Sequence, residues 1–131
     1  MKRRLAEMLW KLADPLVLKM RDRLRHFDSL QSANSQLMAK FGSRGIFEPT
    51  VRLNVGCNVI NHGLRQQIEV GAYSCLAGEI AVQTAEARLR IGRHCFVGNG
   101  SRVWSASSVE IGDHVLISHL VDVHDSDSHS L

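Results

Sequence analysis

The sequence predicts an all-β repeat fold, a coil of short strands stacked in layers, preceded by N-terminal amphipathic helices. Two observations predict the coil: a four-residue phrase that recurs along the chain, and aliphatic residues that recur every six positions. A third observation, apolar residues at helical spacing near the N-terminus, predicts the helices.

The recurring phrase is an aliphatic residue, a polar residue, a β-branched residue and a glycine. It occurs at 53–56, 68–71, 89–92 and 109–112, with starts 15, 21 and 20 residues apart. Self-similarity at a nearly fixed period is typical of stacked repeat proteins. Because the first interval is short, we expect the first coil to be irregular and to act as a cap.

Within the later repeats an inner period of six residues is visible. Six fits neither the 3.6-residue period of a helix nor a long alternating strand. It fits a coil of three short faces whose aliphatic side chains point to a common axis, and such coils must stack to bury them. The aliphatic positions are Val70, Leu76, Val82, Ile91, Val97, Val103, Ile111, Ile117 and Val123.

At this point a family resemblance can be named. The rows at 91–97 (Ile-Gly-Arg-His-Cys-Phe-Val) and 111–117 (Ile-Gly-Asp-His-Val-Leu-Ile) resemble the hexapeptide-repeat acyltransferases. The resemblance covers roughly residues 50–131 and implies a left-handed parallel β-helix. The handedness comes from the resemblance alone, because β crossovers are usually right-handed.

Composition limits the protein class. The chain has 131 residues, enough for one modest domain, with 44% hydrophobic and 5% aromatic residues. No run of eighteen apolar residues occurs, so no membrane-spanning helix is predicted. The basic start lacks the apolar centre and cleavage site of a signal peptide, and we therefore expect a cytoplasmic protein.

The three cysteines, Cys57, Cys75 and Cys95, are odd in number and lack the spacing of a metal site. Cys95 falls at a small-residue position of its coil, which predicts core packing. We expect neither a disulfide nor a metal.

The N-terminal third differs in charge and periodicity. Residues 1–30 hold eight Lys and Arg against four acids, while the rest of the chain holds eight against nine. Asp14-Pro15 is typical of a helix N-cap followed by proline at the first helical position. The sequence therefore predicts basic amphipathic helices over 2–13 and 15–31 (residues 1–31 as a unit), a linker over 32–49 and the β-helix over 50–131.

Two interpretations of the basic helices stay open. They could form a cap that packs on the open end of the solenoid or on a neighbouring subunit. They could instead attach to an anionic membrane surface, which basic amphipathic helices favour, and so place the protein at the inner face of the membrane. Nucleic-acid binding is not predicted, because aromatic interleaving and known motifs are lacking.

The repeat stops after Val123, and the last eight residues are rich in His, Asp and Ser. In the sugar O-acetyltransferase branch of the family, a loop after a coil carries a histidine general base. The order His129-Ser130-Leu131 matches that position, so the resemblance implies that His129 deprotonates an acceptor hydroxyl, which attacks acetyl-CoA. An imidazole can remove such a proton near neutral pH. Asp127, ahead of Asp125, is the candidate to orient the imidazole.

The same residues admit other interpretations. The loop could bind a metal through its histidines and aspartates, or be solvated. His124, Asp125 and Trp104 are expected to contact substrate, and Trp104 should point outward because it follows an inward valine. His94 and His114 occupy equivalent places in successive coils, so we expect them to stack on the outer surface in a structural role.

The sequence thus predicts an acyl-CoA-dependent O-acetyltransferase acting on a sugar hydroxyl, such as a cell-surface polysaccharide precursor. The resemblance implies a homotrimer with active sites between subunits. Serine acetylation fits the loop less well. Family members normally continue for several coils past this histidine, so we expect a truncated acyltransferase, incomplete at the C-terminus. A non-catalytic scaffold or assembly module is the alternative.

Overall fold

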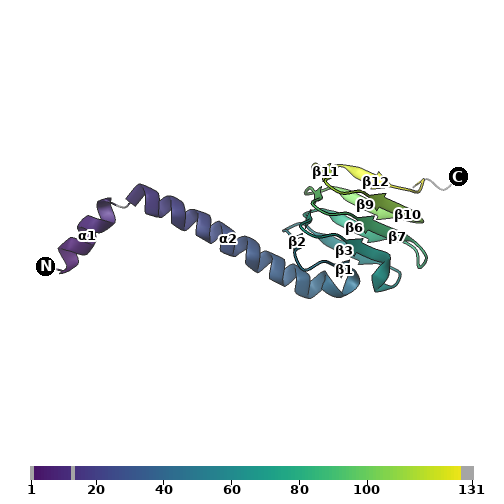
Figure 1. Ribbon diagram of the computed structural model, residues 1–131, viewed down its shortest axis with the longest axis horizontal. Helices are drawn as coiled ribbons and strands as arrows, with labels where there is room; N and C mark the ends of the chain where they lie inside the picture. Colours follow the sequence, from purple (N-terminus) through teal and green to yellow (C-terminus); the bar gives the residue numbers. More distant parts are fainter. Residues whose placement is uncertain (1, 13, 128–131) are drawn as a thin grey trace. The chain divides into compact units, whose positions relative to one another are not determined.

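The structure, a computed structural model, describes residues 2–12 and 14–127, and the chain divides into two compact units, residues 1–32 and 33–131. The first unit contains α1 (Lys2–Leu12) and most of α2 (Asp14–Phe41), as labelled in Figure 1. The predicted helix start at Asp14-Pro15 is confirmed. Neither of these described helices is long and apolar enough to cross a membrane.

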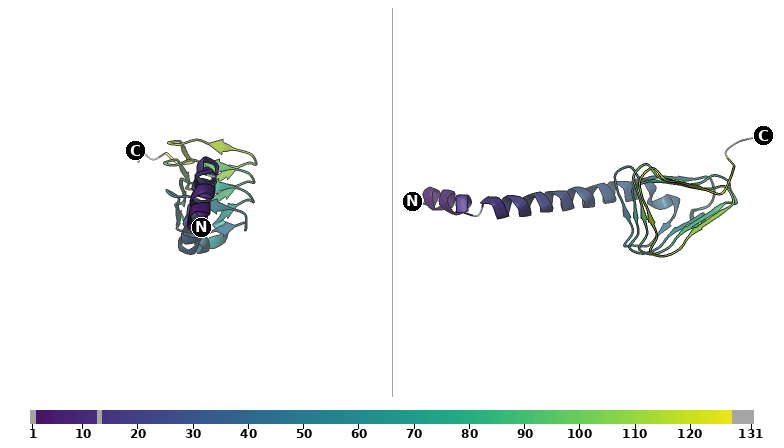
Figure 2. Two further views of the ribbon diagram at one scale, coloured as in Figure 1. Left: turned by 90° about the vertical axis from the view of Figure 1, so that its left-hand side faces the viewer. Right: turned by 90° about the horizontal axis from the view of Figure 1, so that it is seen from above.

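The second unit is a parallel β-solenoid, as predicted. Three four-stranded parallel sheets form its walls: sheet A (β1-β4-β7-β10), sheet B (β2-β5-β8-β11) and sheet C (β3-β6-β9-β12). Seen from above, the coils superpose as a triangle (Figure 2). The strands are β1 (Ile46–Phe47), β2 (Arg52–Leu53), β3 (Asn58–Asn61), β4 (Ile68–Val70), β5 (Cys75–Leu76), β6 (Glu79–Val82), β7 (Arg88–Ile91), β8 (Phe96–Val97), β9 (Arg102–Ser105), β10 (Ser108–Ile111), β11 (Leu116–Ile117) and β12 (Asp122–His124).

Strand register explains the short first interval between the phrases. Phe47, Val70, Ile91 and Ile111 are successive partners in sheet A, so the coils take 23, 21 and 20 residues (70−47, 91−70, 111−91). The phrase at 53–56 begins in sheet B, whereas the other three lie in sheet A. The first coil is therefore the longest, and it begins at β1 rather than at residue 50.

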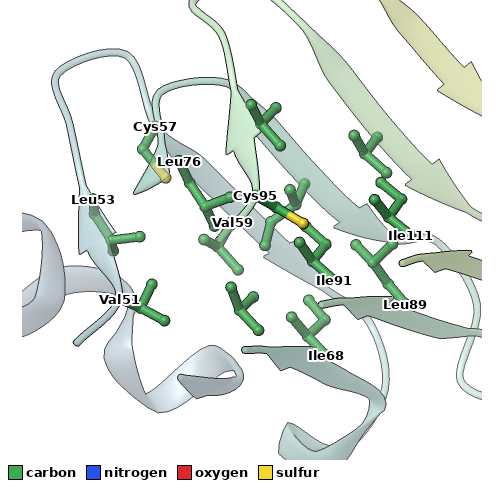
Figure 3. Packing of buried hydrophobic residues seen from close by; sticks show 14 of the residues in the cluster. Val51, Leu53, Cys57, Val59, Ile68, Leu76, Leu89, Ile91, Cys95 and Ile111 are labelled. Carbon is green, nitrogen blue, oxygen red and sulfur yellow. The ribbon is translucent and has the colours of Figure 1, made fainter. Parts of the chain in front are cut away.

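The six-residue period corresponds to the inward positions of the three sheets. The aliphatic side chains are buried along the axis, and Figure 3 shows several of them pointing into the same interior. Leu76, Ile80, Leu89 and Val97 have no exposed surface. Burial of a side chain of this size contributes about 1.5–3 kcal/mol, which makes this column the main source of stability.

Small polar residues occupy the corners between the sheets. The hydroxyl of Ser74 donates to the carbonyl oxygen of Gly92 at 2.7 Å and accepts from the backbone N–H of Cys95 at 3.0 Å. Ser105 donates to the carbonyl oxygen of Arg88 at 2.7 Å. Buried hydroxyls are tolerated here because they pair with backbone groups that the corners leave free.

The predicted linker over 32–49 is wrong for its first part, because α2 continues to Phe41. Leu37, Met38 and Phe41, at helical spacing, pack against the core of the solenoid, and the Asn34 side chain accepts the N–H of Leu53 at 2.8 Å. Packing of these side chains thus continues the helix beyond its predicted end at residue 31.

Candidate functional site

The outer face of sheet C carries the candidate site. Side chains alternate along a strand, so residues next to the inward valines point outward. Arg102 lies opposite Asp122, and Trp104 lies opposite His124, in the pairing of β9 with β12. These side chains border a groove of about 310 Å³, which is lined by Gln83, Arg102, Trp104, Asp122, Val123, His124 and Ser126.

Trp104 points outward as predicted, and its ring is held on two sides. The indole N–H donates to Oε1 of Glu79 at 2.8 Å, and Asn58 donates to Oε2 of the same carboxylate at 2.8 Å. The guanidinium of Arg102 lies 4.8 Å from the centroid of the indole ring, within cation–π range. The groove therefore has a wall made of a fixed aromatic ring.

Arg102 and Asp122 form a bidentate ion pair beside this ring. Arg102 Nε donates to Oδ1 at 2.8 Å, and Nη2 donates to Oδ2 at 2.6 Å. The hydrogen bonds from Arg102 hold the pKa of Asp122 below its usual value, and those to Asp122 raise the pKa of Arg102. Both groups stay charged at neutral pH and largely neutralise each other within the groove.

The tautomer of His124 follows from its backbone partner. Its Nδ1 lies 2.7 Å from the carbonyl oxygen of Ser126, and a carbonyl can only accept, so Nδ1 carries the hydrogen. In the neutral imidazole, Nε2 then keeps its lone pair. The exposed His124 is thus equipped to accept a hydrogen bond, or a proton, from a hydroxyl group in the groove.

Asp125 anchors the loop that follows β12. Its carboxylate accepts three backbone hydrogen bonds, from Ala106 at 2.7 Å, Ser107 at 2.9 Å and Ser108 at 2.6 Å. Desolvation alone would raise the pKa of Asp125, but these N–H donors outweigh it and hold the pKa below its usual value. The contacts described for Asp125 are to backbone, and its role as a substrate ligand stays a prediction.

The expected catalytic pair lies at the limit of the described residues. Asp127 is exposed in the loop after β12. His129 lies outside the described residues, so its expected role as the base stays a prediction. The hydrogen bonds of Asp125 hold the backbone in place four residues before His129 in the sequence.

The sequence interpretation missed Glu79, Arg102 and Asp122. A signal for them was present, since Asn58, Glu79, Arg102 and Asp122 are register partners along the outer face of sheet C. Polar residues at one equivalent hexad position in successive coils must form a ladder. These outward positions repeat with the coil as the inward aliphatic positions do.

The predicted stacking of His94 and His114 is confirmed, and Tyr73 extends it. The two imidazole centroids are 5.0 Å apart with 4° between ring planes, and Tyr73 stacks on His94 at 5.1 Å and 10°. All three residues have positive φ, between 53° and 61°. They form the corner between sheets A and B, away from the groove.

Cys57 and Cys95 are packing residues, as predicted for Cys95, which is 3% exposed, whereas Cys75 is half-buried outside the core. Burial, together with the nearby Cys75, raises the pKa of Cys57 to about 12. Such a thiol stays protonated and unreactive. Among residues 2–12 and 14–127, no three His, Cys, Asp or Glu side chains come together as a metal site.

Comparisons with models of known protein families, with curated proteins and with solved structures gave no match. Function must therefore be argued from the residues and their geometry, and the groove on sheet C is where aromatic, ionic and imidazole groups meet.

Proposed function

We propose that the protein transfers an acyl group, such as acetyl, from acyl-coenzyme A to a hydroxyl group of a sugar. His129 removes the hydroxyl proton while the oxygen attacks the thioester carbonyl carbon. The tetrahedral intermediate expels the coenzyme A thiolate, which takes up that proton. The products are the sugar ester and free coenzyme A. Asp127 orients the His129 imidazole.

The observation that carries the proposal is the groove on the outer face of sheet C, which is bordered by Asp122, His124 and Ser126. Trp104 offers an apolar ring face, while Gln83 and the Arg102–Asp122 pair offer donors and acceptors around it. An apolar wall with a few converging polar groups is typical of small-molecule sites, and it suits a sugar ring with its hydroxyl rim. The repeat rows that resemble hexapeptide acyltransferases support the same reaction class.

Charge in the groove favours a neutral acceptor. Arg102 and Asp122 largely cancel, and Glu79 is shared by Trp104 and Asn58. The Glu79 carboxylate therefore leaves a negative charge beside the groove. This charge would repel the carboxylate of an acidic sugar but would not repel a neutral hexose.

The test is release of coenzyme A thiol from acetyl-CoA in the presence of neutral oligosaccharides, with the ester detected by mass spectrometry. We expect turnover that falls about 10²–10⁴-fold in His129→Ala, since that is the usual contribution of a general base. His119→Ala, an exposed corner histidine, is the matched control. Turnover that survives His129→Ala, or no acetyl-CoA binding by calorimetry, would exclude the proposal.

A homotrimer is part of this proposal, because the resembled enzymes form their active sites between subunits. Light scattering on the purified chain measures the mass. If a monomer turns over acetyl-CoA, the reaction does not require a trimer, and the proposed reaction still stands.

A second candidate, an assembly module without catalysis, is favoured by the outer face of sheet B. Phe96 and Leu116 are partners in adjacent strands, and Leu116 is 75% exposed. Adjacent exposed apolar side chains mark protein-binding surfaces. The double variant Phe96→Asp/Leu116→Asp should abolish association, and the control Glu69→Lys on sheet A should not. With that result and no turnover of acetyl-CoA, the assembly module is the better assignment.

A further inference from the structure

The helices of the first unit present an apolar stripe. At 3.6 residues per turn, Leu16, Met20, Leu24 and Phe27 fall within about a quarter of the circumference of α2. These four side chains are between 46% and 69% exposed. Leu5 and Met8 of α1 are exposed as well. A stripe of large apolar residues on a helix is stable in water only when something covers it.

Basic residues accompany the stripe. Lys19 and Arg23 lie along one edge of it on the helical wheel, and residues 1–30 carry a net charge of +4 from eight Lys and Arg against four acids. The rest of the chain is close to neutral, at −1. The excess positive charge of the protein is thus concentrated on the unit with the exposed stripe.

These two properties together select among the candidate partners. A second copy of the same helix would cover the apolar stripe but bring +4 against +4, which is repulsive. Nucleic acid would satisfy the charge but leave Leu16, Met20 and Leu24 in water. An anionic lipid surface satisfies both, because the apolar face enters the acyl chain boundary while Lys and Arg meet the headgroups.

We propose that residues 2–30 bind an anionic lipid bilayer, with the stripe of Leu16, Met20, Leu24 and Phe27 lying in the plane of the interface. This inference does not depend on the proposed reaction. Each basic residue near an anionic surface strengthens binding by about fivefold, so several together give reversible attachment.

The test is co-sedimentation of the full chain with vesicles of phosphatidylcholine, with and without about 30% phosphatidylglycerol. We expect pelleting with the anionic vesicles alone, and weaker pelleting at about 0.5 M salt than at about 0.1 M. The double variant Leu16→Gln/Leu24→Gln should lose binding at least tenfold. Leu18→Gln is the matched control, since Leu18 is exposed on the opposite side of α2 and should bind like the parent.

A charge variant separates the two contributions and guards against unfolding. Lys19→Gln/Arg23→Gln should weaken binding roughly 20-fold while the far-ultraviolet circular dichroism of the solenoid is kept. Three results would overturn the inference. The first is equal pelleting of the chain with neutral and anionic vesicles. The second is binding to duplex DNA that Leu16→Gln/Leu24→Gln does not change. The third is a lower oligomer mass of that double variant in the absence of vesicles.

Discussion

Gly92 lies directly against Gly112 of the next coil. A β-carbon built on Gly92 would be 2.7 Å from the backbone carbonyl carbon of Gly112. Gly71 has the same relationship to Gly92, also at 2.7 Å. The glycines that close the phrases at 68–71 and 89–92 are therefore explained by the close approach of the next coil, since only glycine leaves room there.

This relationship predicts different outcomes at two equivalent positions. Gly92→Ala should destabilise the solenoid by about 1–3 kcal/mol, because the methyl group meets backbone that cannot swing away. Gly112→Ala should change stability by less than about 0.5 kcal/mol, since no atom of residues 2–12 or 14–127 lies within 4 Å of the added β-carbon. Urea unfolding of both variants measures the difference, and equal values would contradict the explanation.

The ring ladder predicts an order among substitutions at His94. His94→Ala should be the most destabilising, because it loses the stacking, worth about 1 kcal/mol, and keeps the left-handed backbone. His94→Asn loses the ring but tolerates positive φ better. His94→Gly loses the ring and relieves the backbone cost, so it should lie closest to the parent. Thermal melting ranks the three variants. A lowest melting temperature for His94→Gly would refute backbone strain at this corner.

Asp125 predicts an acid-sensitive loop. Its pKa is lowered in the folded protein, so its contribution is present above the unfolded value, about 3.8, and is lost as the pH falls through the lower folded value. Asp125→Ala should cost about 1 kcal/mol at neutral pH, because three backbone donors lose their acceptor. The variant and parent should converge in stability as the pH falls below the lowered pKa of Asp125 in the folded protein. Urea unfolding across pH measures this, and a constant difference would argue against the carboxylate.

Trp104 predicts a specific kinetic change if the groove binds the acceptor. Trp104→Ala should raise the acceptor KM about tenfold, equivalent to about 1.4 kcal/mol, and leave the KM for acetyl-CoA unchanged. Trp10→Ala is the control of the same residue type in the other unit. An unchanged acceptor KM would place the acceptor outside the groove.

Part of the candidate site was predictable from the sequence. The outward position of Trp104 and the stacking of His94 on His114 follow from the six-residue period. The partners of Trp104 were not predicted, because Glu79 lies 25 positions earlier. A residue so distant becomes a neighbour only when the coils are superposed in a definite register.

The sequence by itself determined the solenoid, because inward aliphatic residues every six positions leave no other way to be buried. The tertiary structure decided which phrases are equivalent. The phrase at 53–56 resembles the others, yet it lies in sheet B, because register depends on corner lengths that local similarity does not report. The tertiary structure also decided that α2 reaches Phe41, since Leu37, Met38 and Phe41 pack against the core of the solenoid.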